Sequence, residues 1–415
     1  MIKKIVVSFC LFIGIMAFAQ NGTSSPYSFY GIGDVKFKGT AENRSMGGIS
    51  FFRDSIHLNL QNPASLSRLI YTTFTVVGST NETILSSNNS QNKSKNTTID
   101  YLALGFPIGK FGVSISLMPY SRVGYNILNS NPTPVIVAKS FSGSGGISRV
   151  SVGIAYNITR QLSAGFNIES NFGKITTNSS TAFNNIQYAS REFNESAVSG
   201  VSFTTGLMYN SKFKSKTQIS AGLTFTPSTN LNFINQRILF REEYLQTIGE
   251  VQDFVSVTTP DTQVKLPSKF SIGFGLGQNR KWQVGLEIIN QNNSNFGNRF
   301  NDINNVTYEN ANQYKIGGFY IPKYNSFTNY FQRVTYRGGF NFQNTGLIIN
   351  GKSIKEQTFS LGFGLPLGGS ISNLNIGFEF GKRGTKLGGL VSETYQNLII
   401  GLSLNDKWFN KRKFD

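Results

Sequence analysis

The stretch FGVSISLMPY, residues 111–120, shows the pattern that decides the fold. Apolar side chains occupy every second position from Phe111 to Leu117, and glycine or serine occupies the positions between them. Because successive side chains of a β-strand point to opposite faces, this period predicts a strand with one apolar face and one face of small, polar residues. The same alternation recurs in five further segments, at 149–156, 162–169, 270–277, 374–381 and 398–404. The sequence therefore predicts an all-β protein.

The spacing of the connections favours a membrane barrel over a soluble sandwich, which would show the same period. Short polar turns at 157–160 and 278–281 alternate with long, asparagine-rich connections at 82–96 and 293–329. Outer-membrane barrels have this arrangement, with tight periplasmic turns and longer external loops. Lipid cannot satisfy the backbone groups of an open sheet edge, so an exported sheet with apolar outer faces has to close. We therefore expect a transmembrane antiparallel β-barrel in the bacterial outer membrane.

The expected strands number about fourteen. They span 68–79, 98–107, 110–128, 134–157, 161–178, 196–210, 215–229, 263–278, 281–292, 331–343, 345–351, 354–367, 372–383 and 393–404. An even count places both chain ends on the periplasmic side. A shorter barrel of twelve strands is the alternative if 345–351 is only a loop. Trp282 and Trp408 agree with this orientation, because both fall where a periplasmic aromatic girdle is expected.

The first residues predict export. Two lysines precede an apolar run from Ile5 to Phe18, and a small-residue cleavage site follows, so 1–19 is predicted to be a secretory signal peptide. The only cysteine, Cys10, lies within it, so disulfides and cysteine-bound metals are not expected in the mature chain. No later window offers the roughly 18 consecutive apolar residues of a membrane helix.

Glycines on the inward face of the expected strands predict that something occupies the barrel. A missing side chain in mid-strand frees lumen volume or lets another backbone approach, although glycines that merely ease the curvature of the wall are the alternative. The expected occupant is the polar, irregular segment at 20–67, a plug or hatch that precedes the barrel at 68–404 and a periplasmic tail at 405–415. The inward glycines are Gly112, Gly153, Gly165, Gly206, Gly222, Gly273, Gly285, Gly362, Gly377 and Gly401.

The charge balance indicates anionic partners. Lysine and arginine number 39 against 21 acidic residues, which gives a formal net charge of +18. Export argues against a nucleic-acid partner, so we expect outer-membrane lipid and the phosphates of lipopolysaccharide to meet this charge. Solvated loop lysines with no specific partner are the alternative interpretation.

The motif Asn62-Pro63-Ala64 lies between the signal peptide and the first expected strand. This segment resembles the N-terminal hatch of the FadL-like outer-membrane transporters of long-chain fatty acids, in which an asparagine-proline-alanine motif closes the plug before the first barrel strand. Two further stretches are similar to that family, Arg44–Gly48 and KLPSKFSIGFG at 265–275. The resemblance covers the mature chain in architecture but only the hatch in motif. Independently of the family, Pro63 cannot donate to a sheet ladder or let Asn62 enter a helix, so a fixed bend is expected.

The resemblance implies passive uptake of hydrophobic small molecules such as long-chain fatty acids, with lateral exit beside a kinked third strand. The third expected strand contains Pro119, which removes one ladder hydrogen bond. We predict that Pro119 marks a lateral gate and that the amide of Asn62 satisfies the freed carbonyl. The alternative is that Pro119 lies where the strand leaves the bilayer. The predicted hatch and gating residues are Asn62, Pro63, Ala64, Gly47, Gly48 and Pro119.

A second predicted site lies in the connection at 230–262, which is more apolar than a solvated external loop requires. The residues expected to bind ligand there are Phe233, Ile234, Ile238, Leu239, Phe240 and Tyr244. The same patch suits a different class of function, a FadL-like barrel that acts as a partner in protein secretion or surface assembly, because such a partner needs an exposed apolar patch. An apolar tunnel through an otherwise polar interior would favour transport.

Catalysis is not expected. The only histidine, His57, follows Asp54 by three residues but lies in the irregular segment, where a lone histidine is usually a satisfied polar residue. Barrel hydrolases need a histidine or an acidic pair beside a nucleophile. The sequence contains no phosphate-binding loop, metal-ligand cluster or cofactor motif, so neither a cofactor nor a metal site is predicted.

Overall fold

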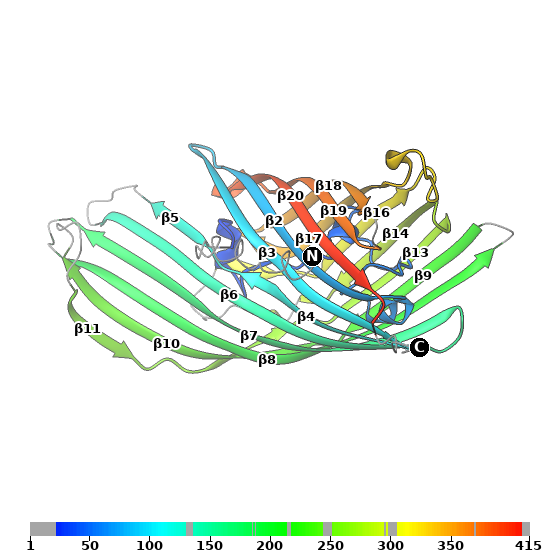
Figure 1. Cartoon of the computed structure of the whole chain (residues 1–415). Coiled ribbons are helices and arrows are strands. Elements are labelled where there is room, and N and C mark those ends of the chain that lie inside the picture. The colour runs from blue at the N-terminus through cyan, green and yellow to red at the C-terminus, as the bar shows by residue number, and fades with distance from the viewer. Residues whose placement is uncertain are drawn as a thin grey trace.

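A computed structural model describes residues 22–129, 136–184, 186, 188–213, 217–243, 251–293, 296–297, 305–368 and 371–408. The predicted signal peptide and most of the predicted tail lie outside these residues. The described chain forms a closed antiparallel β-barrel of 14 wall strands (Figure 1). The barrel closes where β2 (Thr72–Ser86) pairs with β20 (Ser392–Asp406).

Neighbouring wall strands follow one another in chain order. Between β2 and β20 they are β3 (Gln91–Ile108), β4 (Phe111–Arg122), β5 (Tyr125–Asn129), β6 (Ile136–Asn157), β7 (Leu162–Phe183), β8 (Tyr188–Phe213), β9 (Thr217–Thr226), β10 (Thr229–Glu243), β11 (Val251–Val257), β12 (Thr262–Leu266), β13 (Lys269–Gln278), β14 (Trp282–Gln291), β15 (Val306–Tyr308), β16 (Ala311–Tyr320), β17 (Thr335–Ile349), β18 (Lys352–Pro366) and β19 (Asn373–Gly384). Two short 3-10 helices, η4 (Tyr330–Gln332) and η5 (Leu387–Gly389), lie in the connections.

Some wall strands are composite, because an interruption divides them while both parts keep the same neighbour. β4 and β5 both pair with β6, and β9 and β10 both pair with β8. β11 and β12 return along β10, and β13 returns along β9. β15 and β16 both pair with β17. Counted as single strands, the composites give the 14 strands of the barrel, which is the number expected from the sequence.

The two faces of the wall are chemically distinct. In β13 the outward Phe270, Ile272 and Phe274 are 41%, 52% and 54% exposed, whereas the inward Ser271 and the glycines are buried. Outward apolar side chains recur on β4, β7, β14 and β18. Such a band needs hydrocarbon around it, and a closed ring leaves no backbone edge unpaired within the lipid. The protein is therefore an outer-membrane barrel.

Several expected strand boundaries are wrong. The connection expected at 82–96 consists of the ends of β2 and β3 with a short turn between them, and β15 and β16 lie within the connection expected at 293–329. Residues 345–351 are no separate strand, since β17 runs to Ile349. The extra strand and the missed one cancel in the total. In the outer part of β3, at 91–98, polar residues occupy both faces, so the period of two disappears although the ladder continues.

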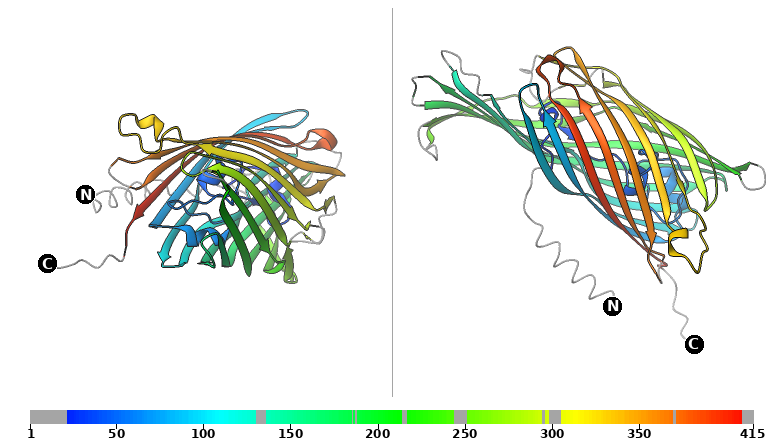
Figure 2. Two further views of the ribbon diagram at one scale, coloured as in Figure 1. Left: turned by 90° about the vertical axis from the view of Figure 1, so that its right-hand side faces the viewer. Right: turned by 90° about the horizontal axis from the view of Figure 1, so that it is seen from above.

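The wall is much taller on one side. β5, β10, β11 and the outer halves of β6, β7 and β8 run well beyond the β2–β3 hairpin, as Figure 1 and the right-hand view of Figure 2 show. β8 has 26 residues, whereas β14 has 10. We call this taller part the extension. It includes most of the expected external loop at 230–262, which is therefore a pair of strands and not a loop.

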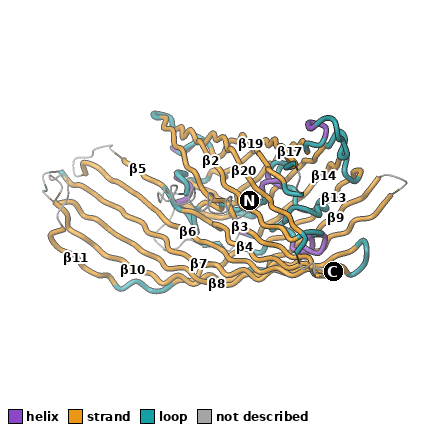
Figure 3. Tube along the Cα trace, viewed as in Figure 1, coloured by secondary structure: helices purple, strands orange, loops and turns teal. Residues whose placement is uncertain are grey.

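Residues 22–71, here called the N-terminal segment, lie inside the ring of strands (Figures 2 and 3). The segment contains the 3-10 helices η1 (Pro26–Phe29) and η2 (Pro63–Arg68), the short strand β1 (Asp34–Val35) and the one-turn helix α2 (Ala41–Arg44). Because η2 occupies the end of the segment, the wall begins at Thr72 and not at residue 68. No helix among the described residues is both long enough and apolar enough to cross a bilayer.

Candidate functional site

The N-terminal segment follows a track of glycines on the inner wall. For each of the ten inward glycines, a Cβ placed on the backbone would come within 4 Å of the N-terminal segment. Such a Cβ on Gly165 would lie 2.6 Å from the carbonyl oxygen of Pro63, and on Gly153 it would lie 2.8 Å from Leu66 Cδ1. A larger residue at these positions would therefore force the segment away from the wall.

The Asn62-Pro63-Ala64 motif begins η2. Asn62 Oδ1 accepts a hydrogen bond from the N–H of Ala64 at 3.1 Å, and Pro63 occupies the first helical turn, where its missing N–H costs nothing. Asn62 Nδ2 donates to the carbonyl of Leu207 on β8 at 3.2 Å. The expected contact of this amide with a carbonyl freed by Pro119 is therefore wrong, because Asn62 lies against β8 and Pro119 belongs to β4.

Gly47 and Gly48 form a turn that docks on the opposite side of the wall. Their φ angles are +69° and +87°, a backbone region that glycine adopts at little cost. The N–H of Gly47 donates to Ser360 Oγ on β18 at 2.9 Å, and Lys315 Nζ on β16 donates to the carbonyl of Gly48 at 2.7 Å. The turn is therefore held by groups from two wall strands.

Buried ion pairs hold the middle of the N-terminal segment. Arg44 of α2 donates to Glu379 on β19 through Nε–Oε1 at 2.9 Å and Nη2–Oε2 at 2.6 Å. Its Nη1 also donates to Asp100 Oδ2 on β3 at 2.6 Å. The neighbouring carboxylates raise the pKa of Arg44 although burial by itself would lower it, so the guanidinium stays charged.

A second ion-pair group surrounds β1. Asp34 lies 3.0 Å from Lys36 Nζ and 2.8 Å from Arg383 Nη1 on β19. Burial by itself would raise the pKa of Asp34, but the charges of Lys36 and Arg383 hold it well below its ordinary value of 3.8. The segment is thus attached to the β18–β20 side of the barrel by charge. Neither Glu379 nor Arg383 could be identified from the sequence as a partner, because each lies more than 300 positions from the residue that it binds.

The ladder between β3 and β4 stops partway along the barrel. Its last register pair joins Leu102 to Leu117, and beyond it β3 pairs with β2 while β4 and β5 pair with β6. The β4–β6 register also shifts between Pro119 and Ser121. This bulge reverses the alternation of faces, since Leu117 is 44% exposed and Val123 is fully buried. We call the region between the outer ends of β3 and β4 the wall break.

The N-terminal segment takes the place of the missing neighbour at the wall break. β1 pairs antiparallel with β4, where Val35 lies opposite Ser121. The N–H of Lys36 donates to the carbonyl of Tyr120 at 2.9 Å. Unpaired strand edges are costly in a membrane, so β1 satisfies backbone groups that β3 leaves free. Displacement of β1 would expose this edge.

An apolar group of side chains lines the interior beside the wall break. Val123 and Tyr125 contribute from the strand that follows Pro119, and Ile32 contributes from the N-terminal segment. The inner apolar cluster consists of Ile32, Val123, Tyr125, Ile147, Ile175, Val198, Leu231, Phe233, Val264 and Leu266. Apart from Phe233, the sequence pattern does not reveal this cluster; the register shift at Pro119, for example, brings Val123 and Tyr125 onto the inward face.

The residues predicted to bind ligand do not share one face. Five of the six lie in β10, so their side chains alternate across the sheet. Phe233 is fully buried in the inner apolar cluster, whereas Ile234 is 63% exposed on the other face. Of the remaining four, Leu239 shares the face of Phe233, Ile238 and Phe240 share that of Ile234, and Tyr244 lies outside the described residues. The prediction of one external site is therefore wrong in its geometry.

His57 forms a local polar contact within the N-terminal segment. Its Nδ1 lies 2.7 Å from Asp54 Oδ2, and its Nε2 lies 3.8 Å from Glu42 Oε1. Burial by itself would lower the pKa of His57, but these carboxylates raise it above the ordinary value of 6.5. Conversely, the charge of His57 outweighs burial and lowers the pKa of Asp54. The contact borders a cavity of about 340 Å³ near the β13–β14 turn.

A family model described as BamG matches residues 1–415 of the chain. Among solved structures, the chain is similar to a Pseudomonas aeruginosa FadL homologue, with a TM-score of 0.61, 12% identity and coverage of 89% of this chain and 98% of that chain. It is also similar to the Ralstonia pickettii toluene transporter TbuX (TM-score 0.58, 14% identity, 88% and 97% covered). The Pseudomonas putida toluene transporter TodX matches with a TM-score of 0.54 and 15% identity, with 91% and 100% covered.

This likeness confirms the FadL-like barrel fold expected from the sequence. The matching structures named above are described as two toluene transporters and a FadL homologue. A search of curated proteins finds no match.

Proposed function

The chain belongs to the BamG family, and we propose that it is an outer-membrane channel for the passive uptake of hydrophobic small molecules, with long-chain fatty acids as the first candidate substrates. The observation that carries this proposal is that the inner apolar cluster adjoins the wall break. The side chains of the cluster are buried against one another, so a hydrophobic molecule would contact them only after the N-terminal segment moves. Each CH₂ group buried there contributes about 0.8 kcal/mol.

The arrangement of charge favours lateral exit over axial passage. Along the barrel axis, the N-terminal segment fills the interior with buried ion pairs such as Arg44–Glu379. An apolar molecule that displaced these groups would leave buried charges unpaired, which is strongly unfavourable. At the wall break, by contrast, the barrier is two register pairs between β1 and β4 together with the ion pair that Asp34 forms with Arg383 of the wall. We infer that the N-terminal segment acts as a plug whose β1 end gates a route into the bilayer.

A reversible cross-link tests this route. Because Lys36 N–H bonds to the carbonyl of Tyr120, Val35 and Ser121 form a non-hydrogen-bonded pair, with Cα atoms about 4.5 Å apart. That separation suits a disulfide. In Val35→Cys/Ser121→Cys, oxidation should lower uptake of radiolabelled oleate and of toluene to the level of cells without the protein, and a reductant should restore it.

The matched control is Thr80→Cys/Thr97→Cys. These residues are register partners on β2 and β3, and their hydroxyl oxygens lie 3.1 Å apart, away from β1. Oxidation of this pair should leave uptake unchanged. If the Val35–Ser121 disulfide forms quantitatively and uptake continues, exit at the wall break is ruled out. If the disulfide stops the uptake of only one of the two compounds, that compound is the one that uses the route.

Pro119 supplies a second test of the gate. Pro119→Val restores a backbone N–H at the bulge, which would extend the β4–β6 ladder and stiffen the strand beside β1. We expect slower oleate uptake with unchanged barrel abundance in the outer membrane. Asn62→Ala should loosen the plug without touching the bulge. Normal uptake by Pro119→Val would mean that the proline has no part in gating.

The extension favours a second candidate function, a partner in protein secretion or surface assembly. Phe254 is 65% exposed and Val255, on the opposite face, is 59% exposed, so the outer end of the extension presents apolar side chains on both sides. In Ile234→Ser/Phe254→Ser, this candidate predicts loss of surface proteins from the outer membrane with normal oleate uptake. Quantitative proteomics of isolated outer membranes distinguishes the two functions.

A further inference from the structure

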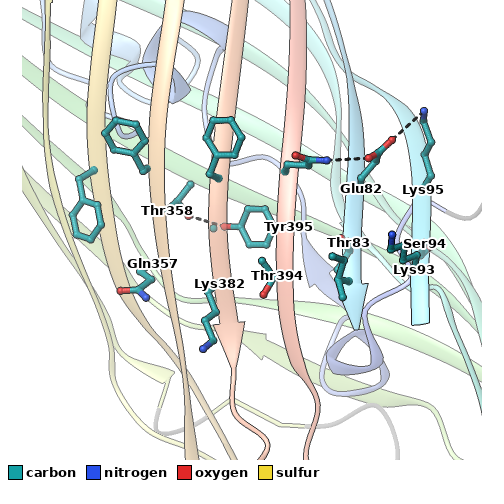
Figure 4. A pocket seen from close by; sticks show the side chains of 16 residues that line it. Glu82, Thr83, Lys93, Ser94, Lys95, Gln357, Thr358, Lys382, Thr394 and Tyr395 are labelled. Carbon is teal, nitrogen blue, oxygen red and sulfur yellow. Dashed lines mark hydrogen bonds and ion pairs between the residues drawn. The ribbon is translucent and has the colours of Figure 1, made fainter. Parts of the chain in front are cut away.

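A groove of about 790 Å³ lies on the outer face of the barrel, over β17–β20, β2 and β3 (Figure 4). The inward side chains of these strands contact the N-terminal segment. Glu356 on β18, for example, forms an ion pair with Lys38 of that segment. The outward side chains that line the groove belong to the opposite face and so face the membrane. The groove is distinct from the wall break and from the inner apolar cluster.

Strand register places one row of groove residues side by side. Phe340, Phe359 and Phe380 are register partners on three consecutive strands, and they are 40%, 47% and 46% exposed. The row continues through Gln396 and Glu82 to Lys95. Three aromatic rings at one level of the wall are typical of the girdle where hydrocarbon meets headgroups.

The next row along the strands, toward the β2–β3 hairpin, carries two lysines. Lys382, Thr394, Ile84 and Lys93 are register partners on β19, β20, β2 and β3. The row on the other side of the aromatic residues is apolar on three strands, with Leu361, Phe378 and Leu398. The groove therefore runs from an apolar zone, past the aromatic residues, to lysines at its outer end, which is the order of an acyl chain followed by an anionic headgroup.

Two of these lysines are available for a ligand. The charge of Lys95 is compensated by Glu82, whose carboxylate lies 3.2 Å away. Glu82 also accepts a hydrogen bond from Gln396 at 3.0 Å. Lys93 and Lys382 form no ion pair with any residue in the described part of the chain. Three strand spacings separate them, which is about 14 Å along the row.

We propose that this groove binds lipid A, the acylated and phosphorylated anchor of lipopolysaccharide. Lipid A carries a phosphate at each end of a disaccharide, and two separated lysines at the headgroup level complement two separated phosphates. A glycerophospholipid with one phosphate matches only one of them. The acyl chains lie on the phenylalanine row and on the apolar row beneath it. The site is independent of what passes through the barrel.

Native mass spectrometry of the purified full-length protein in a mild detergent tests the assignment. The probes are diphosphoryl lipid A, monophosphoryl lipid A and phosphatidylglycerol. Lys93→Gln/Lys382→Gln should weaken binding of diphosphoryl lipid A about 30-fold, because each lysine near an anionic headgroup contributes about fivefold. Monophosphoryl lipid A should bind the wild type with intermediate strength and lose less in the variant.

The control variant Lys110→Gln/Lys265→Gln removes the same charge from two exposed positions away from the groove and should bind like the wild type. Phe380→Ser should weaken every acylated probe, which tests the apolar part separately. Equal affinity of the wild type and Lys93→Gln/Lys382→Gln for diphosphoryl lipid A would overturn the proposal. Phosphatidylglycerol that binds as tightly as diphosphoryl lipid A would also overturn it, since the groove would then be a general phospholipid site.

Discussion

Arg44 of the N-terminal segment and Glu379 of β19 form a buried, two-pronged ion pair that joins residues 335 positions apart. Both side chains are less than a tenth exposed, so neither charge can be compensated by water when the other is removed. The pair links the N-terminal segment to the wall three strands from β3, which borders the wall break.

We predict that Glu379→Gln loosens the plug. Breaking a buried pair from one side typically costs about 3–5 kcal/mol, which is more than about 100-fold in the opening equilibrium. Thiol labelling of a cysteine introduced at buried Ser45 measures this opening. Glu82→Gln, which breaks the exposed Lys95–Glu82 pair, should leave the labelling rate unchanged. Equal labelling in both variants would show that Arg44 does not hold the plug.

Gly165→Ala should displace η2 from the wall. The added methyl group would lie 2.6 Å from the carbonyl oxygen of Pro63, and overpacking of this kind costs about 1–3 kcal/mol. Gly338→Ala is the matched control, since the nearest atom to its Cβ would be Leu361 Cδ2 at 3.8 Å. The expected result is faster labelling of a cysteine at Ser65 in Gly165→Ala alone. Similar rates would mean that the glycine track is not needed for close approach.

The His57–Asp54 contact predicts that plug attachment depends on pH. The folded-state pKa of His57 is raised, so its contribution is fully present below its ordinary pKa of 6.5 and is lost as pH rises through the folded value. The pKa of Asp54 is lowered, so its contribution is present above its ordinary 3.8 and is lost as pH falls towards the folded value.

Raising the pH from 6 to 9 should therefore raise the labelling rate of the Ser45→Cys reporter relative to that of free cysteine at the same pH, a ratio that removes the greater reactivity of the thiolate. In His57→Gln the same change should have little effect, because glutamine does not titrate. A wild type and a His57→Gln variant with the same pH profile would show that another group controls attachment.

Phe233 and Ile234 should respond differently to truncation although they are adjacent. Phe233→Ala opens a cavity in the inner apolar cluster and should lower the free energy of unfolding by about 3–5 kcal/mol. Ile234 is 63% exposed, so Ile234→Ala should change it by less than about 1 kcal/mol. Urea unfolding of barrels folded into lipid vesicles makes the comparison. The reverse order would mean that β10 presents the opposite face to the interior.

Local chemistry explains which features could be predicted. The period of two in residues 111–117 and in the C-terminal strands depends only on the extended backbone, so strand type and facing residues follow from the sequence. Gly112 and Gly165 were placed on the inward face for this reason, before any neighbour was known. Where polar residues occupy both faces, as in the outer part of β3 at 91–98, the same argument finds no strand.

The sequence by itself determined the strand period, the glycine face and the bend at Asn62-Pro63, because each depends on residues close together in the chain. Only the tertiary structure decided that Arg44 meets Glu379, that β1 replaces β3 beside β4, and that Phe340, Phe359 and Phe380 share a row with Lys95. Those relationships depend on the register between strands. Register is set by how the whole ring closes, because a shift of one residue in any strand exchanges its inner and outer faces.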